Sequence, residues 1–245
     1  MPLFAPGMDP AEETIQAARR QGLEIGDGDV IVLAQKIVSK AEGRGVRLSA
    51  VQPSAEAQAL GARTGRPAAL MQLILNESES LLRVTPNVIV ARRRGGQVAA
   101  NAGIDASNIE GGETDTVLLW PADPDSSARA IRAAFRTKLG RAPAVAIADS
   151  LGRAWRLGTL GHAIGAAGLV VVDDRRGEID LFGRTLQATM PSVADSAAAA
   201  AALAMGEGAE GAPAVLVRGL DRYVTQEDGP GAISGLRALN EDLFQ

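Results

Sequence analysis

The chain has very few aromatic residues from which to build a core. It contains two Trp, one Tyr and four Phe in 245 residues, although its hydrophobic fraction of 46% is ordinary for a globular protein. Ala, Val, Leu and Ile must therefore supply most of the core volume. The length fits one large domain or two small ones. A charged fraction of 22% disfavours both a disordered chain and a membrane protein.

The supply of reactive side chains is restricted as well. With no cysteine and a single histidine, the chain lacks disulfides, thiolate metal sites, a cysteine nucleophile and a ready supply of general bases. A bound metal would be a hard cation held by oxygen ligands. The net charge of −4 argues against general binding of nucleic acid. No secretory signal and no membrane-spanning run is recognisable, so we expect a cytoplasmic protein with no membrane partner.

Helical and extended segments are interspersed along the chain, which predicts an α+β fold. The glycine-rich stretch 152–168 is a candidate seam between subdomains. Strands are predicted at 29–33, 87–91, 97–100, 144–148 and 213–217, and helices at 53–63, 67–79, 125–140 and 192–205.

Two carboxylates lie where an oxygen-ligand site is usually built. Asp149 directly follows a predicted strand with the Ser150 hydroxyl beside it, and Asp105 lies among small residues. Carboxylates from separate segments can share divalent ions that bridge phosphates. The alternative is that each is an ordinary turn or cap residue, and spacing alone favours that alternative.

Basic residues occur close to these acids in the sequence. Lys40 and Arg44 follow the first predicted strand, and Arg153 and Arg156 follow Asp149. Such cations suit phosphate binding and phosphoryl transfer. The simpler alternatives are a solvated loop for the first pair and a structural ion pair for the second.

The segment Gly206-Glu-Gly-Ala-Glu-Gly211 matches the dinucleotide pattern G-x-G-x-x-G in the wrong context. That motif needs a strand before it and a helix after it, whereas here a predicted helix precedes and a predicted strand follows. Glu207 and Glu210 would also repel a phosphate unless a cation lay between them. A metal-mediated phosphate contact is the better functional interpretation, and a plain helix-ending loop is the alternative.

Taken together and in order, several segments resemble the coenzyme F420-0:L-glutamate ligases. The resemblance runs from about Pro2 to Leu220, nearly the whole chain. The segments that carry it are 30–44, 101–108, 123–127, 148–153, 163–165, 180–184, 205–208 and 217–220.

The resemblance implies a GTP-dependent ligase whose substrates are F420-0 and L-glutamate. The enzyme would join glutamate to the lactyl-phosphate carboxylate through an acyl phosphate and then add further γ-linked glutamate. It also implies one ligase unit over residues 1–245, with two structural subdomains, antiparallel sheets and flanking helices. An intertwined homodimer and no C-terminal flavin-binding extension are expected on the same ground.

The same resemblance implies roles for individual residues. Two divalent ions, Mg²⁺ or Mn²⁺, would be held by Asp105, Asp149, Ser150 and Glu207, with K⁺ as a further candidate ion. Lys40 and Arg153 would be catalytic. The nucleotide would contact Leu3, Gln35, Lys36, Lys40, Asn108, Met205, Gly206, Gly208 and Gly211.

Two other functions remain open at this point. A divalent-metal-dependent phosphohydrolase could use the same Asp105 and Asp149 pair, and it would release phosphate without any amine acceptor. A non-enzymatic nucleotide- or deazaflavin-binding protein could keep the pocket without any turnover.

Overall fold

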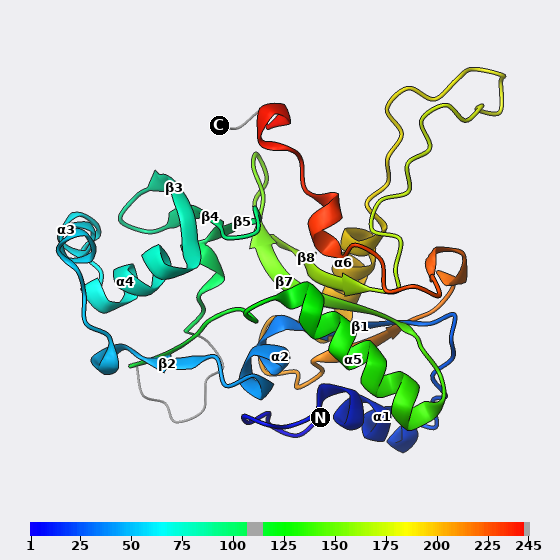
Figure 1. Ribbon diagram of the computed structural model, residues 1–245, viewed down its shortest axis with the longest axis horizontal. Helices are drawn as coiled ribbons and strands as arrows, with labels where there is room; N and C mark the ends of the chain where they lie inside the picture. Colours follow the sequence, from blue (N-terminus) through cyan, green and yellow to red (C-terminus); the bar gives the residue numbers. More distant parts are fainter. Residues whose placement is uncertain (107–114, 243–245) are drawn as a thin grey trace.

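The centre of the molecule is a four-stranded sheet with the strand order β8-β7-β1-β9 (Figure 1). The computed structural model describes residues 1–106 and 115–242, so the predicted nucleotide contact Asn108 lies outside the described residues. One neighbouring pair, β1 and β7, is parallel, and the other pairs are antiparallel. The four strands are β1 (Val30–Ala34), β7 (Ala144–Gly152), β8 (Thr159–Ala167) and β9 (Ala214–Val217).

Alternation of side chains along β1 gives the sheet two buried faces. Ile31 and Leu33 pack in one core cluster, whereas Val30 and Val32 pack in the other. The first face is covered by α1 (Pro10–Arg20), α2 (Gln35–Ala41) and α5 (Pro124–Leu139), and the second by α6 (Val193–Met205), as Figure 1 shows.

A third core cluster lies beside the central sheet, on the left of Figure 1. It includes Leu60, Met71, Ile74, Ile89 and Val117. Its elements are α3 (Ala55–Thr64), α4 (Ala68–Glu77), the sheet of β3 (Ser78–Val84), β4 (Ile89–Arg93) and β5 (Val98–Ala100), and the pair β2 (Gly45–Arg47) and β6 (Thr116–Leu118).

Local sequence explains where the longer helices begin and end. Asp9 and Asp123 accept backbone N–H bonds at the starts of α1 and α5, as aspartate N-caps do. Gly65 and Gly140 adopt the left-handed conformation that ends α3 and α5. Short 3-10 turns occupy Leu48–Ala50, Asn101–Gly103, Asp221–Tyr223, Ala232–Gly235 and Leu239–Glu241.

The predicted class of helices mixed with largely antiparallel sheets is confirmed, but the candidate seam at 152–168 is wrong. Most of that stretch is β8, a strand of the central sheet. Its glycines are needed for packing: a Cβ on Gly161 would collide with the backbone of Ala198, and one on Gly165 with Pro124. Glycine therefore lets α6 and α5 approach the strand closely.

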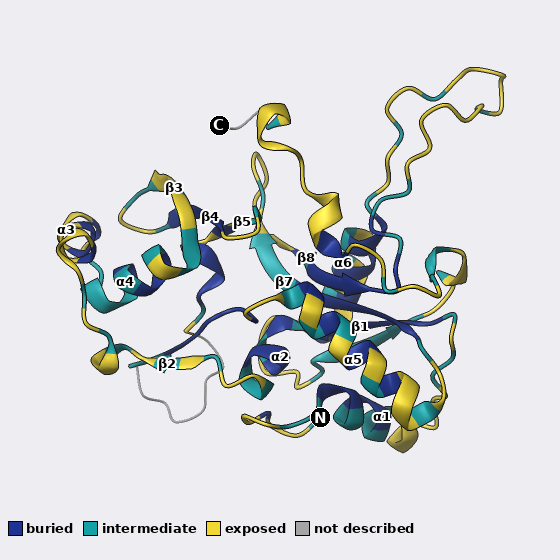
Figure 2. Cartoon of the chain, in the orientation of Figure 1, coloured by how far each residue is buried: buried dark blue, intermediate teal, exposed yellow. Residues whose placement is uncertain are grey.

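Residues 173–191 form an extended arm that leaves the body of the protein and is largely exposed (Figures 1 and 2). Backbone hydrogen bonds join its two sides, from Asp173 to Pro191 and from Arg175 to Thr189. Near the tip, the exposed fraction is 97% for Leu181 and 88% for Phe182.

Within residues 1–106 and 115–242, no helix combines the length and the apolar character that crossing a membrane requires.

Candidate active site

A cavity of about 740 Å³ opens where β1 and β7 end. Because the two strands are parallel and their last pair is Ala34 with Ala148, the residues that follow this pair meet at one edge of the sheet. Lys36 and Asp149 are thereby brought to the same cavity. The carboxyl ends of parallel strands are a common place for ligand sites, and the volume is typical of them.

The cavity gathers most of the residues that the sequence singled out. Every predicted metal ligand and every predicted nucleotide contact among the described residues lines it, as does Lys40. Arg153 is not among the lining residues; its Nη1 donates to the Gly158 carbonyl at 3.5 Å, in the turn between β7 and β8. Its catalytic role stays a prediction. The predicted residues that do line the cavity are Leu3, Gln35, Lys36, Lys40, Asp105, Asp149, Ser150, Met205, Gly206, Glu207, Gly208 and Gly211.

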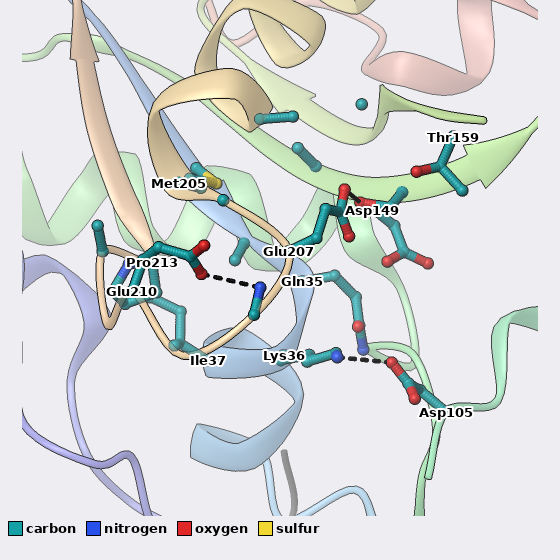
Figure 3. A pocket seen from close by; sticks show the side chains of 18 of the residues that line it. Gln35, Lys36, Ile37, Asp105, Asp149, Thr159, Met205, Glu207, Glu210 and Pro213 are labelled. Carbon is teal, nitrogen blue, oxygen red and sulfur yellow. Dashed lines mark hydrogen bonds and ion pairs between the residues drawn. The ribbon is translucent and has the colours of Figure 1, made fainter. Parts of the chain in front are cut away.

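Four carboxylates line the cavity, and the three that belong to the predicted ligand set reach it from three different elements (Figure 3). Asp149 lies on β7 and accepts a hydrogen bond from Trp120 Nε1 at 2.7 Å. Glu207 follows α6, and its Oε1 accepts a hydrogen bond from Ser150 Oγ at 2.5 Å. Asp105 is placed by two backbone hydrogen bonds with Leu118.

Charge in this cluster is only partly balanced. Lys36 Nζ lies 2.7 Å from Asp105 Oδ2. Burial and, to a smaller extent, the nearby Asp105 carboxylate raise the pKa of Asp149 to about 6. The Trp120 hydrogen bond, the Ser150 backbone N–H and the charge of Lys36 lower this pKa without offsetting the burial. Additional positive charge beside Asp149 would stabilise its ionised form.

The chemistry of the donor set suits a hard divalent cation. Three carboxylates and the Ser150 hydroxyl supply only oxygen atoms, the ligands that Mg²⁺ and Mn²⁺ prefer. The described part of the chain contains no group of three or more His, Cys, Asp and Glu side chains already gathered to hold a metal ion. The residues therefore fit such a cation by donor type, and the predicted ligand set stays a prediction.

Gln35 adds a polar atom that the folded chain leaves unsatisfied. This side chain is 1% exposed and lines the cavity at the start of α2. Its Nε2 donates to Ser39 Oγ at 2.6 Å, whereas its Oε1 has no hydrogen-bond partner among the described residues. An unpaired buried acceptor costs free energy. A ligand with an N–H or O–H donor would remove that cost.

The glycine-rich segment after α6 forms one wall of the cavity. It connects a helix to a strand, which confirms the order that excluded a dinucleotide motif. Glu210 folds back and accepts a hydrogen bond from the Gly208 N–H at 2.8 Å. Gly206 has a φ of 72°, and a Cβ there would overlap the Glu210 carboxyl group, so glycine is required.

Sequence reasoning missed Trp120 and Arg93, which support the site from outside the cavity. Arg93 lies between the strands predicted at 87–91 and 97–100, but Arg92 and Arg93 in fact end β4 and are buried, at 8% and 5% exposure. The signal for Trp120 was its rarity, because a buried indole needs a partner for its N–H. Here that partner is Asp149.

Clustered carboxylates, lysines and a glycine-rich loop at strand ends are typical of enzymes that act on phosphorylated substrates with a divalent cation. Comparison with known protein families also indicates that this chain is an enzyme. The model of the family described as F420-0:Gamma-glutamyl ligase matches residues 1–219, and the chain belongs to this family. It is therefore a ligase.

Similar proteins from archaea cover almost the same length. The chain is 44% identical to a protein of Methanothermobacter thermautotrophicus named Coenzyme F420:L-glutamate ligase, over 100% of this chain and 96% of the relative. A protein of the same name from Methanopyrus kandleri is 42% identical, over 98% of this chain and 92% of the relative. One from Archaeoglobus fulgidus is 44% identical, over 90% and 85% respectively.

Proposed function

We propose that this chain joins L-glutamate to the lactyl-phosphate carboxylate of F420-0 with GTP, and that it then adds further γ-linked glutamate. The family and the names of the archaeal relatives support the ligase activity. The observation that carries the proposal is the cavity itself. Widely separated segments that carry the predicted metal ligands and nucleotide contacts line one space at the ends of β1 and β7.

The proposed reaction passes through an acyl phosphate, because an unactivated carboxylate is a poor acceptor for an amine. A carboxylate oxygen of F420-0 attacks the γ-phosphorus of GTP, and GDP leaves. The amine nitrogen of glutamate then attacks the acyl carbon. The C–O bond to phosphate breaks, inorganic phosphate leaves, and the nitrogen loses its proton to solvent.

Metal ions held by oxygen ligands, together with lysine ammonium groups, would neutralise the negative charge of the phosphates in this reaction. Two Mg²⁺ or Mn²⁺ ions, held by Asp105, Asp149, Ser150 and Glu207, would supply neutralisation of that charge. The ammonium groups of Lys36 and Lys40 line the same cavity. We expect Lys36, which pairs with Asp105 at 2.7 Å, to remain beside the phosphates as a point charge.

The nucleotide would lie between α2 and the glycine-rich loop. Gln35 offers its unpaired Oε1 to an N–H or O–H donor of the ligand. Gly211 lets the backbone come close to the ligand, because it carries no Cβ and no atom lies within 4 Å of where one would be.

Mass spectrometry tests this function directly. The purified chain is incubated with F420-0, L-glutamate, GTP and Mn²⁺, and we expect F420-0 to gain the mass of a glutamyl residue. Phosphate release without glutamate would show a phosphohydrolase instead, and neither product nor phosphate would show a binding protein. Glu207→Gln should lose activity, whereas Glu79→Gln, an exposed change on β3, should not.

We further propose an intertwined homodimer and two subdomains. The arm at 173–191 presents Leu181 and Phe182 to solvent, and a second copy of the chain would cover this apolar tip. The third core cluster, which draws its residues from the segment between Val46 and Leu119, is the natural smaller subdomain.

A further inference from the structure

A buried tryptophan connects the cavity to charged residues that lie outside it. Trp120 is fully buried, at 0% exposure, and its Nε1 donates to Asp149 Oδ2 at 2.7 Å. The guanidinium carbon of Arg93 lies 4.7 Å from the centroid of the indole ring, a cation–π contact. Neither Trp120 nor Arg93 lines the cavity, but Asp149, which accepts the Trp120 hydrogen bond, does.

The backbone around the indole is held in a fixed arrangement. Arg44 Nε donates to the Trp120 carbonyl at 2.8 Å, which fixes the main chain at this residue. A Cβ on Gly103 would overlap the ring, so the backbone of this residue packs directly against it. Asn101 and Ala102 have φ values of 51° and 55° there, a conformation that non-glycine residues seldom adopt.

The charged groups next to the indole are themselves paired. Arg93 Nη2 lies 3.1 Å from one oxygen of Glu77, and Arg44 Nη2 lies 2.9 Å from the other. Arg93 Nη1 also donates to the Ala102 carbonyl at 2.5 Å. A buried arginine with these partners has little freedom to move, so it keeps the plane of the ring in place.

We propose that Trp120 is a positioning residue for Asp149, and that Arg93 acts through it by fixing the indole plane. The inference rests on the proposed function, in which Asp149 holds a divalent cation. The indole N–H can only donate, so it occupies Oδ2 and stops the carboxylate from rotating. The carboxylate is then oriented before the cation binds, which is the usual role of a hydrogen-bond partner behind a metal ligand.

Fluorescence can report on the Trp120–Asp149 contact while both of these residues are retained. The chain has two tryptophans, and Trp155 is 89% exposed, so Trp155→Phe leaves Trp120 as the single reporter. In this parent variant, we expect Mn²⁺ or Mg²⁺, with GTP present, to change the Trp120 emission. The titration should saturate at the dissociation constant that calorimetry measures. Trp155→Phe is also the matched control for removing an indole, and it should keep the wild-type kinetics.

Removal of the N–H tests the role itself. Trp120→Phe, made in the Trp155→Phe parent, should weaken Mn²⁺ binding by about 10- to 100-fold in calorimetry and lower kcat. The KM for L-glutamate should stay unchanged. Should Trp120→Phe fail to fold, incorporation of β-(3-benzothienyl)alanine at this position keeps the shape of the ring without its N–H. We expect the same loss of Mn²⁺ affinity from it.

The outcomes separate this inference from the proposed function. A parent that binds no divalent cation in the presence of GTP would overturn the proposed metal-dependent ligase. A parent that binds Mn²⁺, combined with a benzothienyl variant of equal affinity and equal kcat, would overturn the positioning role alone. Weaker Mn²⁺ binding with an unchanged glutamate KM supports both.

Discussion

Single residues in the cavity have unfavourable features that a bound ligand would relieve. Asp149 carries its carboxylate in a desolvated position near Asp105, and Gln35 keeps a buried oxygen without a partner among the described residues. Both features cost folding free energy. Such costs occur mainly at functional sites, because the arrangement of groups that binds a ligand is often not the most stable one.

Asp149→Asn should stabilise the chain at the cost of activity. The pKa of Asp149 is raised from 3.8 to about 6, so the folded state holds this proton more tightly than the unfolded state. The stability that this group contributes is fully present below about pH 4 and is lost as the pH rises through about 6. Without divalent metal, we expect the substitution to add roughly 1–3 kcal/mol to the unfolding free energy at pH 8 and less at pH 4.5. Urea denaturation at both pH values measures this, and a gain that does not grow with pH would contradict it.

Gln35→Met should affect nucleotide binding more than folding. The change keeps the volume and removes both the unpaired oxygen and the donor to Ser39, so their effects on stability partly cancel. We expect the KM for GTP to rise about tenfold, the equivalent of one hydrogen bond, while kcat changes little. Steady-state kinetics measure the effect. Gln58→Met on the exposed side of α3 is the control, and an equal rise there would count against a direct contact.

At the level of secondary-structure elements, the site is formed by the ends of strands and by helices packed closely on the sheet. The strands at 29–33 and 144–148 could be predicted, because their apolar runs are short and bounded by turns. Their parallel pairing, which brings Lys36 to Asp149, could not, since a sequence carries no mark of which strands become neighbours. For the same reason, spacing alone favoured a turn or cap role for Asp105.

Two elements of the site were missed for identifiable reasons. The segment after β1 was considered as a solvated loop, but it is α2, whose seven residues are too few to show helical periodicity. β8 was hidden by its glycines, which weaken strand propensity while allowing α5 and α6 to approach. The glycine-rich loop after α6, by contrast, was predicted in its correct context.

Gly161→Ala tests the close packing of α6 on β8. A Cβ at this position would collide with the Ala198 backbone, so α6 must shift, and the loop that carries Glu207 shifts with it. We expect a loss of about 2–4 kcal/mol in the free energy of unfolding. Gly152→Ala is a matched control on the same hairpin, because no atom lies within 4 Å of its Cβ. Similar losses from the two variants in chemical denaturation would argue against this packing.

The cavity depends on the whole molecule, because the three predicted acidic ligands come from different parts of the fold. Asp149 comes from the central sheet, Glu207 from the loop after α6, and Asp105 from a segment that pairs with β6. The Trp120 and Arg93 contact joins the central sheet to the sheet of β3, β4 and β5. A displacement between these parts would separate the acids without unfolding either part.

The arm gives a test of assembly at the same scale. Leu181→Glu combined with Phe182→Glu changes two side chains that are almost fully exposed, so the fold should be unaffected. We expect light scattering to show a dimer for the wild type and a monomer for this variant, because charges cannot be buried in an apolar contact. Asp174→Ala and Glu178→Ala, which change exposed charged residues of the arm outside its apolar tip, serve as controls. A variant that remains dimeric would exclude the tip as the contact.

Transfer of ¹⁸O tests the central claim, activation of the substrate carboxylate by phosphorylation in this cavity. F420-0 labelled with ¹⁸O in the lactyl carboxylate is incubated with the chain, GTP, L-glutamate and Mn²⁺. We expect glutamylated product together with inorganic phosphate that carries one ¹⁸O atom, because the carboxylate oxygen leaves with the phosphate. Glutamylated product with unlabelled phosphate, or phosphate release without any glutamylated product, would contradict the account.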